Sequence, residues 1–169
     1  MKILLLKFRN IGDVLLSTPL VNNLRHHYPN AQIDFCVNKE TEAMLTLNPN
    51  LNKIITYDRI AIKSLTSIKR LWRELQFIRS FKKENYDVVI NLTSGDRGNL
   101  IAWISNATTR IGYSNKSWFF RKSLTHELPK QELRHTVDAS LDPLRLLNIP
   151  ISNKSVEIFW DSKDEQAIS

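Results

Sequence analysis

Short, nearly continuous apolar runs separated by polar turns dominate the first half of the chain. One run covers residues 3–6 and continues at Phe8, and a similar run covers residues 86–92. Continuous rather than alternating apolar residues are typical of strands buried on both faces, as in a parallel sheet covered by helices. The same pattern predicts further strands at 32–37, 53–58, 109–113 and 156–160.

Apolar residues at helical spacing predict helices between these strands. The first helix, residues 14–27, contains Pro19, which we expect to kink it or to loosen its first turns. Shorter helices are predicted at 41–47, 100–104 and 135–147. The longest helix, residues 64–83, carries an apolar stripe that we expect to face the core, formed by Leu65, Ile68, Leu71, Trp72, Leu75 and Ile78.

Strands and helices alternate along the chain, which predicts an α/β fold with a Rossmann-like, doubly wound parallel sheet. In the usual winding, the second and third strands lie on one side of the first strand, and the fourth lies on the other. The turns after the first and fourth strands then flank the crevice at the switch point, where ligands bind in such sheets. Those turns are residues 9–13 and 93–98, and they form the strongest candidate site.

Asp13 is the residue of these turns with the clearest chemistry. It is predicted to lie in the first helical turn after the first strand, where a carboxylate can take a proton from a bound hydroxyl. The alternative is that Asp13 only complements the helix dipole. Gly12 is expected to serve the backbone of a tight turn. The other candidate ligand-binding residues are Arg9, Asn10, Thr93, Asp96 and Arg97, the last two of which equally suit the start of a helix.

Composition narrows the class of protein. The chain has 169 residues, of which 42% are hydrophobic and 24% are charged, as expected for one soluble domain. The single cysteine, Cys36, excludes an internal disulfide, and the first apolar run is too short for a signal peptide. We therefore expect a cytoplasmic protein. The four histidines lack metal-ligand spacing, and only one glycine of a dinucleotide fingerprint is present, so we expect neither a metal nor an NAD site.

Positive charge is concentrated in one segment. The net charge is +7, and residues 59–83 alone hold eight lysines or arginines against one glutamate. Such a basic segment suggests an anionic partner: a phosphate, a carboxylate, a nucleic acid or a membrane surface. Arg59 and Lys63 are predicted to lie in the loop after the third strand, at the carboxyl edge of the sheet. They are therefore candidates for binding an anion, whereas the remaining cations suit a solvated helix face.

The segment 9–19, in which Gly12-Asp13 is followed by Thr18-Pro19, resembles the opening motif of the ADP-heptose lipopolysaccharide heptosyltransferases. Residues 86–93, 110–113, 121–126 and 135–150 also match that family. The segments 91–93 and 121–126 look most like the heptosyltransferase III group, which adds a side-branch heptose. The resemblance covers nearly the whole chain, but only the N-terminal half of such an enzyme.

The resemblance implies the N-terminal half of a two-domain GT-B glycosyltransferase. Residues 1–160 would form the acceptor-binding domain, and residues 161–169, which look like the polar start of a further helix, would begin the linker. The C-terminal domain, which binds the nucleotide sugar in the family, would be absent, and the fragment alone would be inactive. The family is inverting and transfers heptose from ADP-heptose to the inner core of lipopolysaccharide, without a cofactor or metal.

The resemblance also assigns roles to residues. It makes Asp13 the general base. The implied partners are the lipopolysaccharide inner core and an ADP-sugar, with the inner-membrane surface as a peripheral contact and no nucleic acid. The residues that it implies for acceptor binding are Arg9, Asn10, Gly12, Arg59, Lys63, Thr93, Asp96 and Arg97.

Two alternatives remain open at this point. One is a GT-B transferase for another sugar, because the donor is chosen by the half of the enzyme that this chain lacks. The other is a non-enzymatic module that binds anions or nucleic acid through the basic segment. No known nucleic-acid motif is visible, and aromatic residues are not interleaved with the basic ones.

Overall fold

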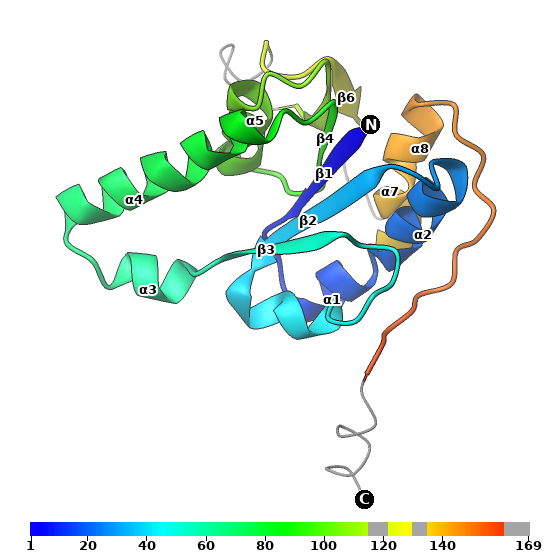
Figure 1. Cartoon of the computed structure of the whole chain (residues 1–169), viewed down its shortest axis with the longest axis horizontal. Coiled ribbons are helices and arrows are strands. Elements are labelled where there is room, and N and C mark those ends of the chain that lie inside the picture. Colours follow the sequence, from blue (N-terminus) through cyan, green and yellow to red (C-terminus); the bar gives the residue numbers. More distant parts are fainter. Residues whose placement is uncertain (115–121, 130–134, 161–169) are drawn as a thin grey trace, which may run out of the picture.

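The computed structural model describes residues 1–114, 122–129 and 135–160, which form one α/β domain around a parallel sheet (Figure 1). The sheet has the strand order β3-β2-β1-β4-β5-β6, and all five strand pairs are parallel. The predicted doubly wound arrangement, with two strands on one side of the first strand, is therefore confirmed. The strands are β1 (Lys2–Lys7), β2 (Gln32–Asn38), β3 (Lys53–Tyr57), β4 (Val88–Asn91), β5 (Thr109–Tyr113) and β6 (His126–Leu128).

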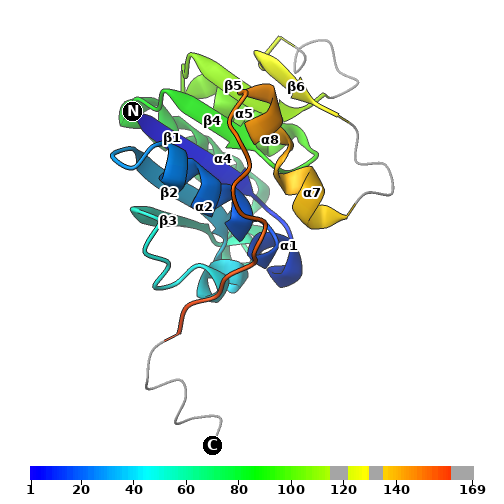
Figure 2. The same cartoon turned by 90° about the vertical axis from the view of Figure 1, so that its right-hand side faces the viewer.

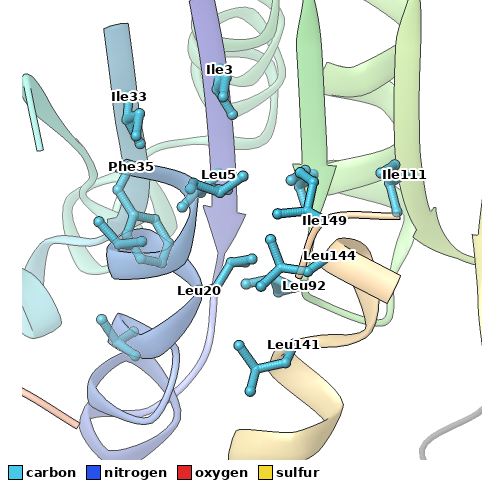
Figure 3. Packing of buried hydrophobic residues seen from close by; sticks show 14 of the residues in the cluster. Ile3, Leu5, Leu20, Ile33, Phe35, Leu92, Ile111, Leu141, Leu144 and Ile149 are labelled. Atoms are coloured by element: carbon cyan, nitrogen blue, oxygen red, sulfur yellow. The ribbon is translucent and has the colours of Figure 1, made fainter. Parts of the chain in front are cut away.

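Strand β1 contains an unbroken run of apolar residues because helices cover both faces of the sheet. Ile3 and Leu5 belong to one core cluster, and Leu4 and Leu6 belong to the other; all four are at most 1% exposed. Figure 3 shows Ile3 level with Ile33 and Leu5 level with Phe35 of the neighbouring strand, with Leu20 below them. A strand with two buried faces cannot alternate apolar and polar residues.

The helices divide between these two faces. Helices α2 (Thr18–His27), α7 (Thr136–Ser140) and α8 (Asp142–Leu146) cover the face of Ile3 and Leu5, as Figure 2 shows. Helices α4 (Ser67–Ser80) and α5 (Asp96–Ile104), with the 3-10 turn η2 (Phe81–Glu84), cover the face of Leu4 and Leu6. Helices α1 (Ile11–Leu15) and α3 (Arg59–Lys63), with the 3-10 turn η1 (Lys39–Met44), follow the carboxyl ends of strands.

Proline divides two of the predicted helices into shorter pieces. The helix predicted over 14–27 is split into α1 and α2, and Pro19 occupies the first turn of α2. The loosening expected at Pro19 is thus confirmed as a break. The helix predicted over 135–147 is likewise split into α7 and α8, with Pro143 in the first turn of α8. In both places proline cannot donate a backbone hydrogen bond to the preceding turn.

The helix predicted over 64–83 differs most from expectation. It begins at Ser67, and Ile68, Leu71, Trp72 and Leu75 are exposed, so the prediction that they face the core is wrong. Only Ile78 of that stripe is buried within α4. The side of α4 that meets the domain is formed instead by Glu74, Phe77 and Ile78, which are half-buried or buried.

Residues 156–160 form no strand, so the last predicted strand is wrong. The extended segment before them is held by side chains of α2: the Asn23 amide accepts from the Ser152 amide nitrogen (2.7 Å) and donates to the Asn153 carbonyl (2.6 Å). The sixth strand is β6, which pairs with β5 and was not predicted. The predicted linker start, residues 161–169, lies outside the described residues.

A close approach between α5 and β4 fixes the start of α5. Gly98 packs so tightly on Asn91 that an added Cβ would lie 2.2 Å from the Asn91 side-chain oxygen. The Asn91 side chain cannot move aside easily, because it donates to Asn99 (2.9 Å) and accepts from the Thr93 amide nitrogen (3.0 Å). All three of Asn91, Gly98 and Asn99 are buried.

Gly98→Ala should therefore destabilise the domain by about 1–3 kcal/mol, the usual cost of overpacking a core. Gly12→Ala is the matched control, because Gly12 also lies in a helix but an added Cβ there meets nothing within 4 Å. Alanine favours a helix over glycine, so the control should be neutral or slightly stabilising. Urea unfolding of both variants checks this, and equal stabilities would contradict it.

Candidate functional site

The carboxyl ends of β1 and β4 are joined side by side, as the sequence predicts for a switch point. The Phe8 amide nitrogen donates to Thr93 Oγ1 (2.8 Å), and the Arg9 guanidinium donates to Ser94 Oγ (2.8 Å). A cavity of about 320 Å³ lies here, lined by Phe8 and residues 93–98. The structure therefore brings the predicted residues Arg9, Thr93, Asp96 and Arg97 to one crevice.

Asp13 lies in the first turn of α1, as predicted, and is half-buried. Its main-chain carbonyl accepts from Ser17 Oγ (2.7 Å). Within the described residues, the Asp13 carboxylate has no hydrogen bond or ion pair and is not the N-cap of its helix. A carboxylate without a protein partner at the carboxyl edge of a sheet is available to accept a proton from a ligand.

Lys7 is a residue of this edge that the sequence reasoning missed. It ends β1 and is only 3% exposed, which is unusual for lysine. Burial lowers its pKa, whereas the negative charge of Asp13 acts in the opposite direction and the charge of Arg9 lowers the pKa further. A lysine inside a fully buried strand was the available signal, because burying an amine costs free energy that a ligand or a charged neighbour can offset.

Asn10 and Gly12 lie at the start of α1, close to Asp13 in the sequence. Asn10 is the exposed N-cap of α1, and its side chain makes no capping hydrogen bond. The backbone requirement expected at Gly12 is absent, because its φ is not positive and an added Cβ would find open space. The glycine with positive φ is instead Gly95 (φ 144°), the N-cap of α5. The expectation of a tight turn at Gly12 was therefore wrong: helix α1 begins before it.

The Arg97 side chain is held mainly by contacts with two other side chains of the protein. Its guanidinium donates to Glu74 Oε1 and to the Tyr57 hydroxyl, both at 2.9 Å, and lies 4.1 Å from the centre of the Tyr57 ring. The Tyr57 hydroxyl also donates to Glu74. We call these three residues the Arg97 cluster. It connects β3, α4 and α5, and it leaves the Arg97 side chain 33% exposed beside the crevice.

Arg59 and Lys63 lie on α3 rather than in a loop, so the expected conformation was wrong although the place at the end of β3 was right. The Asp58 side chain caps α3 by accepting from the Ala61 amide nitrogen (2.9 Å). Arg59 pairs with Glu40 (3.1 Å) and remains about half exposed, and Lys63 is exposed. Figure 1 shows α1 and α3 at the same edge of the sheet.

A larger cavity, of about 560 Å³, lies between β3, α3 and α4 and was not anticipated. Apolar side chains of Ala61, Ile62, Leu65 and Phe77 line much of it, and Arg73 also lines it. It is separate from the crevice beside Thr93, with which it shares no lining residue. The sequence could not indicate it, because the start of α4 was expected to pack on the core.

Neither a metal-ligand cluster nor a membrane-spanning helix occurs in the described part of the chain. No three of its histidine, cysteine, aspartate and glutamate side chains gather closely enough to hold a metal ion. None of its helices combines the length and the apolar character that crossing a bilayer requires.

Sequence comparison finds relatives among enzymes of lipopolysaccharide synthesis. Two Escherichia coli proteins named lipopolysaccharide heptosyltransferase 3, one of them from strain K12, are 30% and 31% identical over 141 residues. The chain is a relative of the lipopolysaccharide heptosyltransferases. The match covers 82% of this chain but only 40% of each E. coli protein, so the chain spans well under half the length of these heptosyltransferases. No protein-family model matches the sequence.

More distant matches, in sequence and in structure, are also glycosyltransferases. The lipopolysaccharide core heptosyltransferase OpsX of Haemophilus influenzae is 23% identical over 121 residues, which are 69% of this chain and 32% of that heptosyltransferase. A glycosyl transferase family 9 structure from Veillonella parvula superposes with a TM-score of 0.78 at 23% identity, over 96% of this chain and 45% of its own. The E. coli heptosyltransferase WaaC, solved with ADP-2-deoxy-2-fluoro heptose, gives 0.74 at 16% identity, over 93% and 51%. The Rossmann-like fold predicted from the sequence is thus shared with these glycosyltransferases.

Through Tyr57, the Arg97 cluster should make the stability of the folded chain depend on pH in the alkaline range. Burial, together with the hydrogen bond to Glu74, raises the pKa of Tyr57 to about 12, although Arg97 acts in the opposite direction. In the unfolded chain the phenol titrates near its ordinary value of about 10. Between pH 10 and 12 the unfolded state therefore loses a proton that the folded state keeps, so the free energy of unfolding falls as pH rises.

Tyr57→Phe should remove this contribution. Its free energy of unfolding should fall less steeply than that of the wild type over the same pH range. Urea unfolding at several pH values, with circular dichroism as the signal, measures both slopes. Identical slopes would mean that Tyr57 titrates alike in the folded and unfolded chains.

Proposed function

We propose that this chain is the acceptor-binding part of an inverting glycosyltransferase that transfers heptose from ADP-heptose to the inner core of lipopolysaccharide. The observation that carries the proposal is the half-buried carboxylate of Asp13 at the carboxyl edge of the sheet, which has no partner among the described residues. It lies inside the motif by which the sequence resembles the heptosyltransferases. The relationship to lipopolysaccharide heptosyltransferase 3 supports the choice of sugar and acceptor.

In this proposal Asp13 is the general base. Its carboxylate takes the proton of an acceptor hydroxyl while that oxygen attacks the anomeric carbon of the donor, and ADP leaves from the opposite face of the sugar. The attack from the opposite face inverts the configuration. Lys7, where it is protonated, attracts negative charge at Asp13 and at an acceptor bound beside it. General base catalysis of this kind contributes roughly 10²–10⁴-fold to a rate.

The acceptor is proposed to lie along the carboxyl edge of the sheet. Arg9, Thr93 and Asp96 would contact its sugars from the crevice, together with Asn10 and Gly12 on α1 and the exposed part of Arg97. The exposed cations of α3, Arg59 and Lys63, would meet its phosphate and carboxylate groups.

The donor is proposed to bind mainly to a second domain outside this chain, without a cofactor or metal. Electrostatic stabilisation of the leaving diphosphate contributes strongly to the rate of such a transfer, so residues 1–169 alone should be inactive. Because the acceptor is a membrane lipid, the proposed location is the cytoplasm, with peripheral contact to the inner membrane. Residues 1–160 form the acceptor-binding domain in this proposal.

Asp13→Asn tests the proposal directly. The substitution keeps the shape of the side chain but removes its ability to accept a proton, so turnover of the complete enzyme should fall roughly 10²–10⁴-fold. The Kd for the acceptor should change little, and thermal unfolding should show that the variant is folded. Release of ADP from ADP-heptose in the presence of acceptor measures turnover. Near-normal turnover would rule out Asp13 as the base.

Replacement of both Arg59 and Lys63 by alanine tests the acceptor contact. The double variant should bind a lipid-free core oligosaccharide more weakly, and its binding should depend less on salt, because two cations near the anionic groups are lost. Lys82→Ala with Lys83→Ala is the matched control, since it removes equal charge from the other end of the basic segment. An unchanged acceptor Kd at low salt would contradict the assignment.

A further inference from the structure

Helix α4 presents an exposed apolar face. Ile68, Leu71, Trp72 and Leu75 are 85%, 61%, 58% and 39% exposed, respectively. Their spacing of three, four and seven residues places them in one row along the helix. We call this row the α4 stripe. Large apolar side chains exposed singly are normal, but a contiguous row of four is the mark of a binding surface.

The α4 stripe cannot turn inward, because the opposite side of α4 is anchored. Glu74 is paired with Arg97 at 2.9 Å. The ring of Phe77 packs against Tyr57 and Phe81, with ring centres 5.1 Å and 5.2 Å apart. Rotation of α4 about its axis would break the ion pair and expose these rings. Exposure of the stripe is therefore a property of the folded domain.

Basic side chains occupy several other positions of α4 and of the adjoining turn η2. They are all exposed, and within the described residues none of them forms an ion pair. The one acidic residue of α4, Glu74, is already paired with Arg97, so it does not neutralise them. Within the described residues, the surface thus combines exposed apolar side chains with positive charges that form no ion pair. These cations are Lys69, Arg70, Arg73 and Arg79 on α4, and Lys82 and Lys83 on η2.

This combination matches the chemistry of an anionic bilayer surface. Helices that lie in the membrane interface carry tryptophan and leucine on one side and lysine and arginine on the other. Each cation near an anionic membrane adds about 1 kcal/mol of attraction. Figure 1 shows α3 and the start of α4 standing away from the sheet, which leaves room for a broad, flat partner. A protein partner of matching acidity would fit the charge, but its binding would not require lipid.

We propose that the α4 stripe docks this protein on the surface of an anionic phospholipid bilayer. Ile68, Leu71 and Trp72 enter the boundary between headgroups and acyl chains, and the neighbouring cations contact lipid phosphates. The proposed function includes a peripheral contact with the inner membrane, and this proposal names the surface that makes it. It does not require that the protein transfers heptose. Binding to pure phospholipid can therefore fail or succeed independently of catalysis.

Sedimentation with vesicles tests the proposal. The chain should bind vesicles of phosphatidylethanolamine and phosphatidylglycerol, should bind phosphatidylcholine vesicles much more weakly, and should be released by salt. Trp72→Gln should reduce binding several-fold, because a large apolar contact is lost. Trp160→Gln is the matched control: Trp160 is also 58% exposed but lies outside the stripe, so binding should be unchanged.

Lys69→Glu combined with Arg73→Glu tests the electrostatic part. Reversal of two charges should weaken binding to anionic vesicles by at least about tenfold. All substituted side chains are exposed, and circular dichroism should confirm that each variant is folded. The proposal is overturned if the chain stays in the supernatant with anionic vesicles at low salt. It is equally overturned if Trp72→Gln and Trp160→Gln bind alike, or if Trp72→Gln abolishes only self-association.

Discussion

The burial of β1 on both faces is the constraint on which the rest of the structure depends. Because Leu4 and Leu6 pack under α4 and α5 while Ile3 and Leu5 pack under α2 and α8, the strand can lie only in the middle of the sheet. Its end is then fixed against the end of β4. Lys7, Phe8 and Arg9 reach the carboxyl edge as a direct result, and the chain enters α1 there with Asp13 in its first turn.

Two groups of hydrogen-bonded polar side chains fix the positions of the elements at the carboxyl edge of the sheet. The buried side chains of Asn91 and Asn99 bind one another and hold Gly98 against β4, so α5 starts at a defined place beside the crevice. The Arg97 cluster then ties α5 to β3 and α4. Buried or half-buried polar groups must be paired to be tolerated, and here their pairing connects four separate elements. Arg97 is consequently both a wall of the crevice and a structural residue.

In the two proposals above, the basic segment serves two surfaces rather than one. Arg59 and Lys63 on α3 stand at the edge that also carries α1, where the proposed acceptor would lie. The cations of α4 share their helix with an exposed apolar stripe, a combination that fits a bilayer better than a soluble sugar. The proposed lipid-linked acceptor would offer both chemistries at once: anionic sugars above the membrane and anionic headgroups within it.

The sequence by itself determined the relative order of the first four strands, the disturbance of the helix at Pro19 and the place of Asp13, because these follow from local signals and from the general winding of parallel sheets. Tertiary structure alone decided that the α4 stripe faces outward, that Arg97 pairs with Glu74, that Lys7 is buried near Asp13, and that residues 126–128 form the last strand. Helical periodicity defines an apolar face but not what that face meets. Contacts between residues far apart in the chain settle that question, and no local pattern records them.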